Sequence, residues 1–247
     1  MYASGKKGVL FQTGYMKRFN PGFQKIKDVL PQLGELEFVT SAIYISAPEP
    51  EITGKVEPTS WKSDAKRAGG GFLNASGSHH LDLMRYFFGD IKTVSCKCRY
   101  DNDAGRDYYI SASLVTESGV DITMRLGRVD ISDLGPSWLP VRGGWNESIE
   151  VIGTRGYIKV ENPTWQGYEA MRVTKWLNGM PGPDVEYYEC NVQWINELSA
   201  FVESYRTGKL SEKASTVSAG YRVDLLIAQM LASGAQDGHP IELVYQG

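Results

Sequence analysis

The sequence predicts an α+β fold, with a large, open, mainly antiparallel sheet and helices packed on one of its faces. Apolar residues alternate with polar ones in consecutive segments between residues 94 and 126 and between residues 148 and 189. Turn signals such as Glu117-Ser118-Gly119 join these segments as hairpins. Helical spacing of apolar residues occurs before and after the strand-rich region. Strands grouped together, with helices apart from them, favour α+β over a βαβ fold.

The N-terminal third predicts a strand, a helix, a second strand and a second helix. A short β-like run at residues 9–15 precedes a helix that begins at Pro21 and has an apolar stripe of Phe23, Ile26, Val29 and Leu30. Residues 36–45 alternate and predict a strand, which a proline-rich loop follows. Residues 77–88 predict the second helix, with Gly89 after its last turn.

The rest of the chain predicts most of the sheet. Strands are expected at residues 94–100, 108–114, 120–126, 148–152, 157–160, 170–176, 185–189 and 241–245, and helices at residues 192–205 and 216–232. In the strand at 120–126, Asp121, Thr123 and Arg125 alternate with apolar residues, so one face is apolar and the other mixed. Residues 131–145 predict a long loop, either a binding loop or a simple connector.

Composition excludes several classes of protein. The 247 residues carry a net charge of −3, which gives no electrostatic signature for nucleic acid or an anionic membrane. No stretch approaches the roughly 20 apolar residues of a membrane span, and the N-terminal apolar run is too short for a secretory signal. Three cysteines do not form a disulfide framework, so we expect a cytoplasmic protein.

Motifs for cofactors and metals are absent from the sequence. No glycine-rich dinucleotide or phosphate loop follows a strand, and the three histidines do not have the spacing of a zinc site. His80 falls on the apolar stripe of its helix and is expected to be a packed residue. We therefore predict that this chain alone binds no cofactor and no metal.

The segment at residues 69–82, with Gly69-Gly70-Gly71 followed by His79 and Asp82, is the most informative for function. Because residues three apart share a helix face, His79 and Asp82 can lie together at the mouth of a cleft. The simpler interpretation is a helix start with a solvated histidine–aspartate pair, and spacing alone favours it.

Several motifs in this order resemble the glucose–fructose oxidoreductase / inositol dehydrogenase / rhizopine-catabolism (Gfo/Idh/MocA) family over residues 8–247. They are Gly14-Tyr15-Met16-Lys17-Arg18-Phe19-Asn20-Pro21, Trp61 with Asp64 and the glycines, Gly77-x-His79-x-x-Asp82, Gly153-Thr154-Arg155-Gly156, and an ending with Gly238 and Pro240.

The resemblance implies a C-terminal sheet domain that supplies a substrate pocket and an oligomer interface, beside an N-terminal Rossmann domain that binds NAD(P). It implies His79 as the acceptor of the substrate hydroxyl proton, a role that suits imidazole near neutral pH. Residues expected to bind substrate are Lys17, Arg18, Trp61 and Asp82. Residues 1–20 are then a remnant of the junction with the missing domain, and residues 21–247 form the sheet domain.

Two departures from the family pattern leave two functions open. The dinucleotide fold is missing, and Ala75 stands where the family commonly has an aspartate, four residues before the histidine. The first hypothesis is the substrate-binding and oligomerisation part of an NAD(P)-dependent oxidoreductase of sugar or cyclitol hydroxyls, with a Rossmann domain supplied elsewhere. The alternative is a standalone, non-redox protein that binds a carbohydrate-like ligand or performs acid–base chemistry. In both, the mixed sheet face is expected to form a homo-oligomer.

Overall fold

A computed structural model describes residues 8–46, 65–100, 105–129, 145–163 and 169–245 of the chain. The strands are β1 Leu36–Ser46, β2 Ile91–Tyr100, β3 Asp107–Thr116, β4 Asp121–Val129, β5 Trp145–Gly153, β6 Gly156–Asn162, β7 Met171–Leu177, β8 Asp184–Tyr188 and β9 Ile241–Glu242. The helices are η1 Met16–Phe19, α2 Pro21–Val29, η2 Leu30–Gln32, α3 Ala65–Ala68, η4 Leu73–Gly77, α4 Ser78–Phe88, α5 Gln193–Thr207 and α6 Val217–Ala235.

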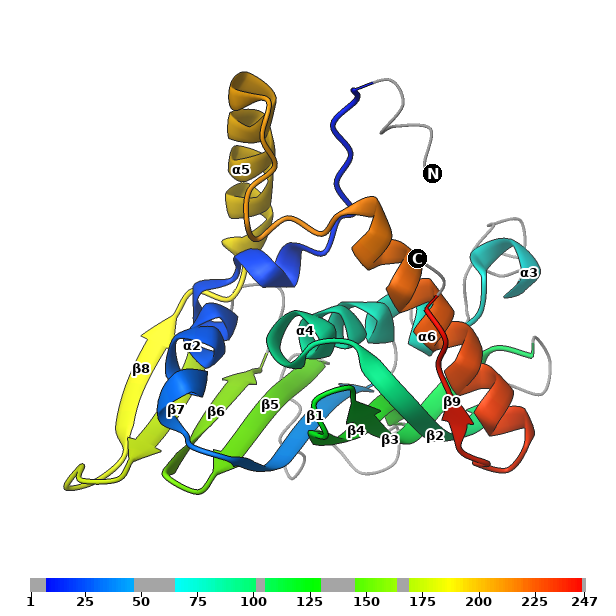
Figure 1. Cartoon of the computed structure of the whole chain (residues 1–247), viewed down its shortest axis with the longest axis horizontal. Helices are drawn as coiled ribbons and strands as arrows, with labels where there is room; N and C mark the ends of the chain where they lie inside the picture. Colours follow the sequence, from blue (N-terminus) through cyan, green and yellow to red (C-terminus); the bar gives the residue numbers. More distant parts are fainter. Residues whose placement is uncertain (1–7, 47–64, 101–104, 130–144, 164–168, 246–247) are drawn as a thin grey trace.

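Within these ranges, the strands form a single sheet in the order β8-β7-β6-β5-β1-β4-β3-β2-β9. Strands β1 and β4 pair in parallel, and the other neighbours pair antiparallel. Figure 1 shows helices α2, α4 and α6 above one face of this sheet. The predicted fold class, an open and mainly antiparallel sheet with helices on one face, is confirmed.

The core lies between the sheet and the helices. On β4, Ile122, Met124 and Leu126 are fully or almost fully buried, while Asp121 and Arg125 face outward, as the alternation predicts. Helix α2 begins as the sequence indicates: the side chain of Asn20 accepts hydrogen bonds from the backbone amides of Gly22 and Phe23, and Pro21 occupies the first helical position.

Two predicted strands differ from the structure. Residues 9–15 form no strand and share a single antiparallel bridge, between Thr13 and Ser215. The described residues place no other strand beside this run, and an extended segment without a partner leaves its hydrogen bonds unmade. The last strand is shorter than predicted because β9 ends at Glu242. The predicted long loop lies almost wholly outside the described residues.

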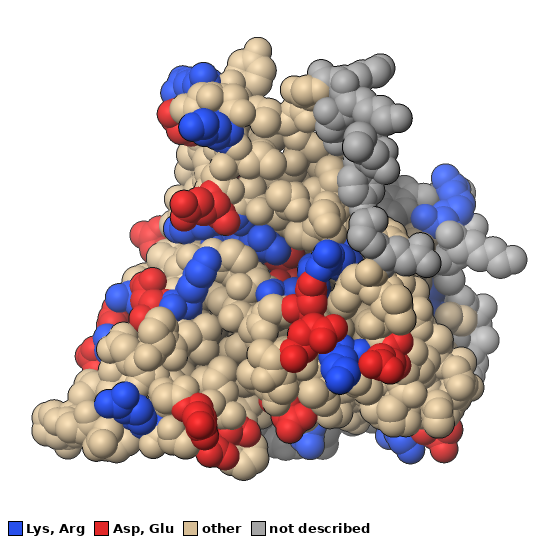
Figure 2. All heavy atoms as spheres, in the orientation of Figure 1, with Lys and Arg blue, Asp and Glu red and all other residues tan. Residues whose placement is uncertain are grey.

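Helix α5 stands apart from the layered body. Figure 1 shows it projecting away from the sheet, beside the N-terminal segment. Basic and acidic residues are interspersed over the face drawn in Figure 2, without a large patch of one sign. None of the helices in the described ranges combines the length and the apolar character that a membrane crossing requires.

Candidate functional site

The glycine run positions the start of the central helix through Asp107, at the beginning of β3. The Asp107 carboxylate accepts hydrogen bonds from the amides of Gly71, at 2.7 Å, and Leu73, at 2.6 Å. A Cβ atom on Gly71 would lie 2.2 Å from the Asp107 carbonyl oxygen, so the close approach of the two backbones requires glycine there. Gly69, with φ +78°, also adopts a backbone conformation that favours glycine.

Helix α4 agrees with the helix predicted at residues 77–88, and an irregular turn that the pattern did not predict precedes it. Residues Leu73–Gly77 form a π-helical turn, η4, that leads directly into α4. Such turns are rare, and they occur frequently at functional sites. His79 lies in the first turn of α4, immediately after this irregular segment, and its ring packs edge-on against Tyr15 with the centroids 5.6 Å apart.

A buried carboxylate, Glu147 of β5, organises the polar groups beneath this helix start. The Lys17 ammonium group donates to both Glu147 oxygens, at 2.7 and 2.5 Å. Asn162 donates its amide to Oε1 at 2.6 Å, and His80 Nε2 lies 3.0 Å from Oε2. The remaining ring nitrogen of His80, Nδ1, lies 2.7 Å from the Ser41 hydroxyl. This set of five residues is called the Glu147 cluster below.

Electrostatics fix the protonation states in the Glu147 cluster. Burial alone would raise the pKa of Glu147, but the charge of Lys17 and the hydrogen bond from His80 outweigh it and hold that pKa well below its ordinary value. Burial lowers the pKa of His80, so its imidazole is neutral at pH 7. Because an ionised carboxylate can only accept, Nε2 of His80 carries the proton, and Nδ1 accepts from Ser41.

Arg18 and Asp82 form a second buried pair. Arg18 Nε donates to Asp82 Oδ2 at 2.6 Å and Nη2 donates to Oδ1 at 2.7 Å, a bidentate geometry that satisfies both groups. Both side chains are buried, and Ser215 adds a weaker contact to Asp82. The expectation that His79 and Asp82 lie together at the mouth of a cleft is therefore corrected, because the Asp82 carboxylate binds Arg18 inside the protein.

His79 Nδ1 and Asn162 Oδ1 are two side-chain atoms of this region that have no hydrogen-bond partner among the described residues. The side chain of His79 is half-buried, and its Nδ1 is a buried atom. Burial lowers the pKa of His79 to about 3, and the charge of Lys17 acts in the same direction. The imidazole is therefore neutral at pH 7, which is the form that can accept a proton.

Of the five predicted site residues, the structure describes four. Lys17 is buried rather than being part of a charged surface, and its charge acts on His79 from the Glu147 cluster. Arg18 and Asp82 pair with each other instead of presenting free groups. Trp61 lies outside the described residues. The roles of these residues in substrate binding remain predictions.

Sequence reasoning missed the most connected residue of the site, Glu147. On β5 the inward positions are Trp145, Glu147, Ile149 and Val151, so a charged residue stands within an apolar alternation. That interruption was the available signal, but the predicted strand began at residue 148 and excluded it. Buried carboxylates require partners, and the partners here come from parts of the chain distant in sequence.

The glycine run offers no free cradle for a phosphate group. The amides of Gly71 and Leu73, which could cradle a phosphate after a glycine run, already donate to the Asp107 carboxylate. Among the described residues, no group of three or more histidine, cysteine, aspartate or glutamate side chains is placed to hold a metal.

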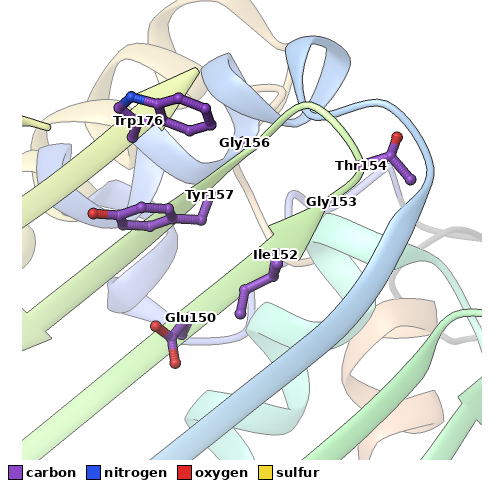
Figure 3. Close-up of a pocket in the computed structure, with 7 residues that line it drawn as sticks. All are labelled: Glu150, Ile152, Gly153, Thr154, Gly156, Tyr157 and Trp176. Atoms are coloured by element: carbon purple, nitrogen blue, oxygen red, sulfur yellow. The ribbon is translucent and has the colours of Figure 1, made fainter. Parts of the chain in front are cut away.

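A hollow lies on the opposite face of the sheet from α4. Figure 3 shows Ile152, Tyr157 and Trp176 around it, at the β5–β6 hairpin, with Glu150 at its edge. Alternation along β5 places Glu150 and Ile152 on the outer face and Glu147 on the helix side. The hollow therefore does not communicate with His79 through the sheet.

Comparison with solved structures shows where this fold occurs. The aldose-aldose oxidoreductase from Caulobacter crescentus shares 18% identity, with a TM-score of 0.74, 97% of this chain covered and 65% of that chain covered. Levoglucosan dehydrogenase in complex with NADH shares 15% identity, with a TM-score of 0.77 and coverages of 98% and 68%. A 3-ketoreductase from Actinomadura kijaniata, in complex with NADP, shares 16% identity, with a TM-score of 0.70 and coverages of 93% and 64%.

These structures define the class: the fold is the sheet domain found in a group of larger oxidoreductases, of whose lengths this chain spans about two thirds. Residues 23–159 match the GFO/IDH/MocA C-terminal domain. The chain belongs to the GFO/IDH/MocA family. No curated protein sequence matches it.

Proposed function

We propose that this chain forms the substrate side of an NAD(P)-dependent oxidoreductase that acts on a sugar or cyclitol hydroxyl. The observation that carries the proposal is His79 at the start of α4, whose Nδ1 has no hydrogen-bond partner among the described residues. Proton transfer from a substrate hydroxyl to the imidazole would follow the role that the family resemblance implies. Levoglucosan dehydrogenase and the aldose-aldose oxidoreductase support a sugar-like substrate by their names.

The same observations support the binding of substrate by this chain and of the redox cofactor by a separate domain. The amides of the glycine run are occupied by Asp107, so the redox cofactor would bind to a dinucleotide-binding domain that is joined to or associates with this chain. Cys96 and Cys98 are reduced thiols whose sulfur atoms lie 3.5 Å apart, which supports the cytoplasmic location that we propose.

We expect the isolated chain to bind neither NAD(H) nor NADP(H), because the described residues offer no free phosphate cradle. Isothermal titration with each dinucleotide measures this directly. The same chain, joined to a dinucleotide-binding domain, should bind the cofactor stoichiometrically. Tight binding of NAD(H) by the isolated chain would refute the proposal that a separate domain binds the cofactor.

The alternative is a standalone, non-redox protein, and Ala75 favours it. Alanine in place of the family aspartate cannot orient an imidazole, and Ala75 is exposed at the start of the site. This alternative predicts that the isolated chain binds or transforms a polyol without any dinucleotide. A panel of sugars and cyclitols tested by calorimetry, with and without an added dinucleotide-binding domain, separates the two functions.

We also propose that the outer sheet face forms a homo-oligomer, as the mixed alternation on β4 predicts. The side chains of Phe38, Ile152, Tyr157 and Trp176 form a row across four neighbouring strands, since each is the cross-strand partner of the next. Phe38 is 64% exposed. A flat face with exposed apolar residues suits two-fold packing of sheet on sheet.

We expect light scattering to report a dimer or larger oligomer at micromolar concentration, and Phe38→Glu with Ile152→Glu to convert it to a monomer, because the charges would be buried without partners. Val244→Glu, at an exposed position away from this row, is the matched control and should leave the oligomer intact. A wild-type chain that is monomeric at this concentration contradicts the proposal.

A further inference from the structure

Two cysteine thiols lie side by side on β2. Cys96 and Cys98 are two residues apart, so their side chains point to the same face of the strand, and their sulfur atoms lie 3.5 Å apart. Strands β3, β4 and β1 lie between β2 and β5, which carries Glu147. The two thiols are therefore a group separate from the Glu147 cluster, and they are called the β2 thiol pair below.

Helix α6 packs against β2 and leaves the two thiols unequally exposed (Figure 1). Cys96 is buried, and its backbone amide donates a hydrogen bond to the Ser233 hydroxyl of α6 at 2.9 Å. Cys98 is only half-buried. A Cβ atom on Gly234 would lie 2.9 Å from the Cys98 sulfur, so a glycine in α6 leaves room for this thiol. Cys98 is therefore the more accessible sulfur of the pair.

The two thiols also differ in acidity. The hydrogen bond from the Cys96 thiol lowers the pKa of Cys98 against the opposing effect of burial, and the Tyr100 hydroxyl acts in the same direction as Cys96. The same hydrogen bond, together with burial, raises the pKa of Cys96. Because the thiolate is the nucleophilic form of cysteine, Cys98 is the sulfur that attacks an oxidant, and Cys96 keeps its proton.

The backbone of β2 allows the two sulfur atoms to join. Residues two apart in a strand have Cα atoms about 6.7 Å apart, at the upper end of the range that disulfides bridge. Within the described ranges, β9 pairs with β2 only before Cys96, and the pairing of β2 with β3 shifts register between Arg99 and Tyr100. A local tightening of this lightly held part of β2 brings the sulfur atoms from 3.5 Å to a bond length of about 2.05 Å.

We propose that the β2 thiol pair is a site of reversible oxidation by a hydroperoxide. The Cys98 thiolate attacks the terminal oxygen, the O–O bond breaks, and the remaining alkoxide or hydroxide takes up the proton that Cys98 released. The Cys96 thiol then attacks the sulfur of the Cys98 sulfenic acid, so an S–S bond forms and the oxygen leaves as water with the Cys96 proton. The two thiols lose two electrons and the peroxide gains them. A dithiol reverses the reaction by thiol–disulfide exchange.

The test treats the reduced, folded, full chain with hydrogen peroxide, then unfolds it and alkylates the remaining thiols. Mass spectrometry of the intact chain and of its peptides counts and locates the alkyl groups. We expect Cys96 and Cys98 to escape alkylation together, with a mass lower by two hydrogen atoms, while Cys190 is alkylated. Dithiothreitol, added before alkylation, should make all three cysteines reactive again.

Serine variants separate the roles of the two thiols. In Cys96→Ser, oxidation should stop at the Cys98 sulfenic acid, which dimedone captures, because the second thiol is missing. In Cys98→Ser, loss of thiols to peroxide should slow by on the order of tenfold or more, because the accessible thiolate is removed. Cys190→Ser is the matched control, since it removes a buried cysteine outside β2, and it should form the disulfide at the wild-type rate.

Three outcomes overturn the proposal. Cys98 of the folded wild type reacts no faster than Cys190, the disulfide joins two chains instead of Cys96 and Cys98, or Cys98→Ser loses its thiols at the wild-type rate. The comparison of Cys98 with Cys190 in the wild type decides the proposal even if a variant fails to fold. The result is independent of the proposed function, because the assay requires neither a dinucleotide nor a polyol.

Discussion

Glu147→Gln is expected to destabilise the protein by about 3–5 kcal/mol at pH 7, the range observed when one partner of a buried ion pair is removed. The Glu147 carboxylate is the acceptor for Lys17, His80 and Asn162, and all four side chains lie in the interior of the protein. An amide of the same shape retains some hydrogen bonds but leaves the Lys17 ammonium group buried without a counter-charge. Urea unfolding monitored by circular dichroism measures the difference.

Glu150→Gln is the matched control, because Glu150 lies three residues along the same strand and faces outward. Its effect should remain within about 0.5 kcal/mol. Adding Lys17→Met to Glu147→Gln should recover part of the lost stability, since the uncompensated charge is removed. If Glu147→Gln costs no more than Glu150→Gln, the Glu147 cluster does not stabilise the site as described.

The pH dependence of folding stability follows from the same groups. The pKa of Glu147 is depressed in the folded state, so its stabilisation is complete above the ordinary value of 4.5 and is lost as the pH falls through the folded pKa. His79 and His80 also have lowered pKa values, so the unfolded chain takes up protons first and stability falls as the pH drops below about 6.5. In Glu147→Gln, the loss of folding stability below pH 4.5 should be smaller than in the wild type.

Most strands of the sheet were predicted well because the alternation of apolar and polar residues along a strand can be recognised from adjacent residues alone. On β4, each apolar residue of the pattern points to the core, since burial on one face fixes the register. The run at residues 9–15 begins with three consecutive apolar residues but forms no strand, because a strand also requires a neighbour, and the neighbour is a non-local property. Helical periodicity did not predict the π-helical turn at Leu73–Gly77, where the amide of Leu73 donates to Asp107, a residue distant in sequence.

The surroundings of the candidate residues were predicted in part, and the roles of these residues remain predictions. The family resemblance drew attention to His79, Lys17, Arg18 and Asp82, and the structure places all of them around the start of α4 or beneath it. Spacing suggested a His79–Asp82 pair, whereas Asp82 pairs with Arg18, which is 64 residues away in sequence. Glu147 could not be linked to Lys17 without the tertiary fold, because the two residues are separated by 130 positions.

We propose that His79 accepts the proton of a substrate hydroxyl in an enzyme completed by a dinucleotide-binding domain. We expect His79→Asn to lower kcat by about 10²–10⁴-fold, because the amide cannot act as the general base. In the wild type, the acid limb of kcat/KM should lie well below pH 6.5, because burial and Lys17 depress the pKa of His79.

The most direct measurement is the turnover of sugars and cyclitols by the completed enzyme, followed by the absorbance of the reduced dinucleotide. His79→Asn is compared with His239→Asn, which changes an exposed histidine far along the chain, and thermal unfolding establishes that both variants are folded. The account predicts that kcat collapses in His79→Asn and is unchanged in His239→Asn. A folded His79→Asn variant that turns over substrate at the wild-type rate would contradict it.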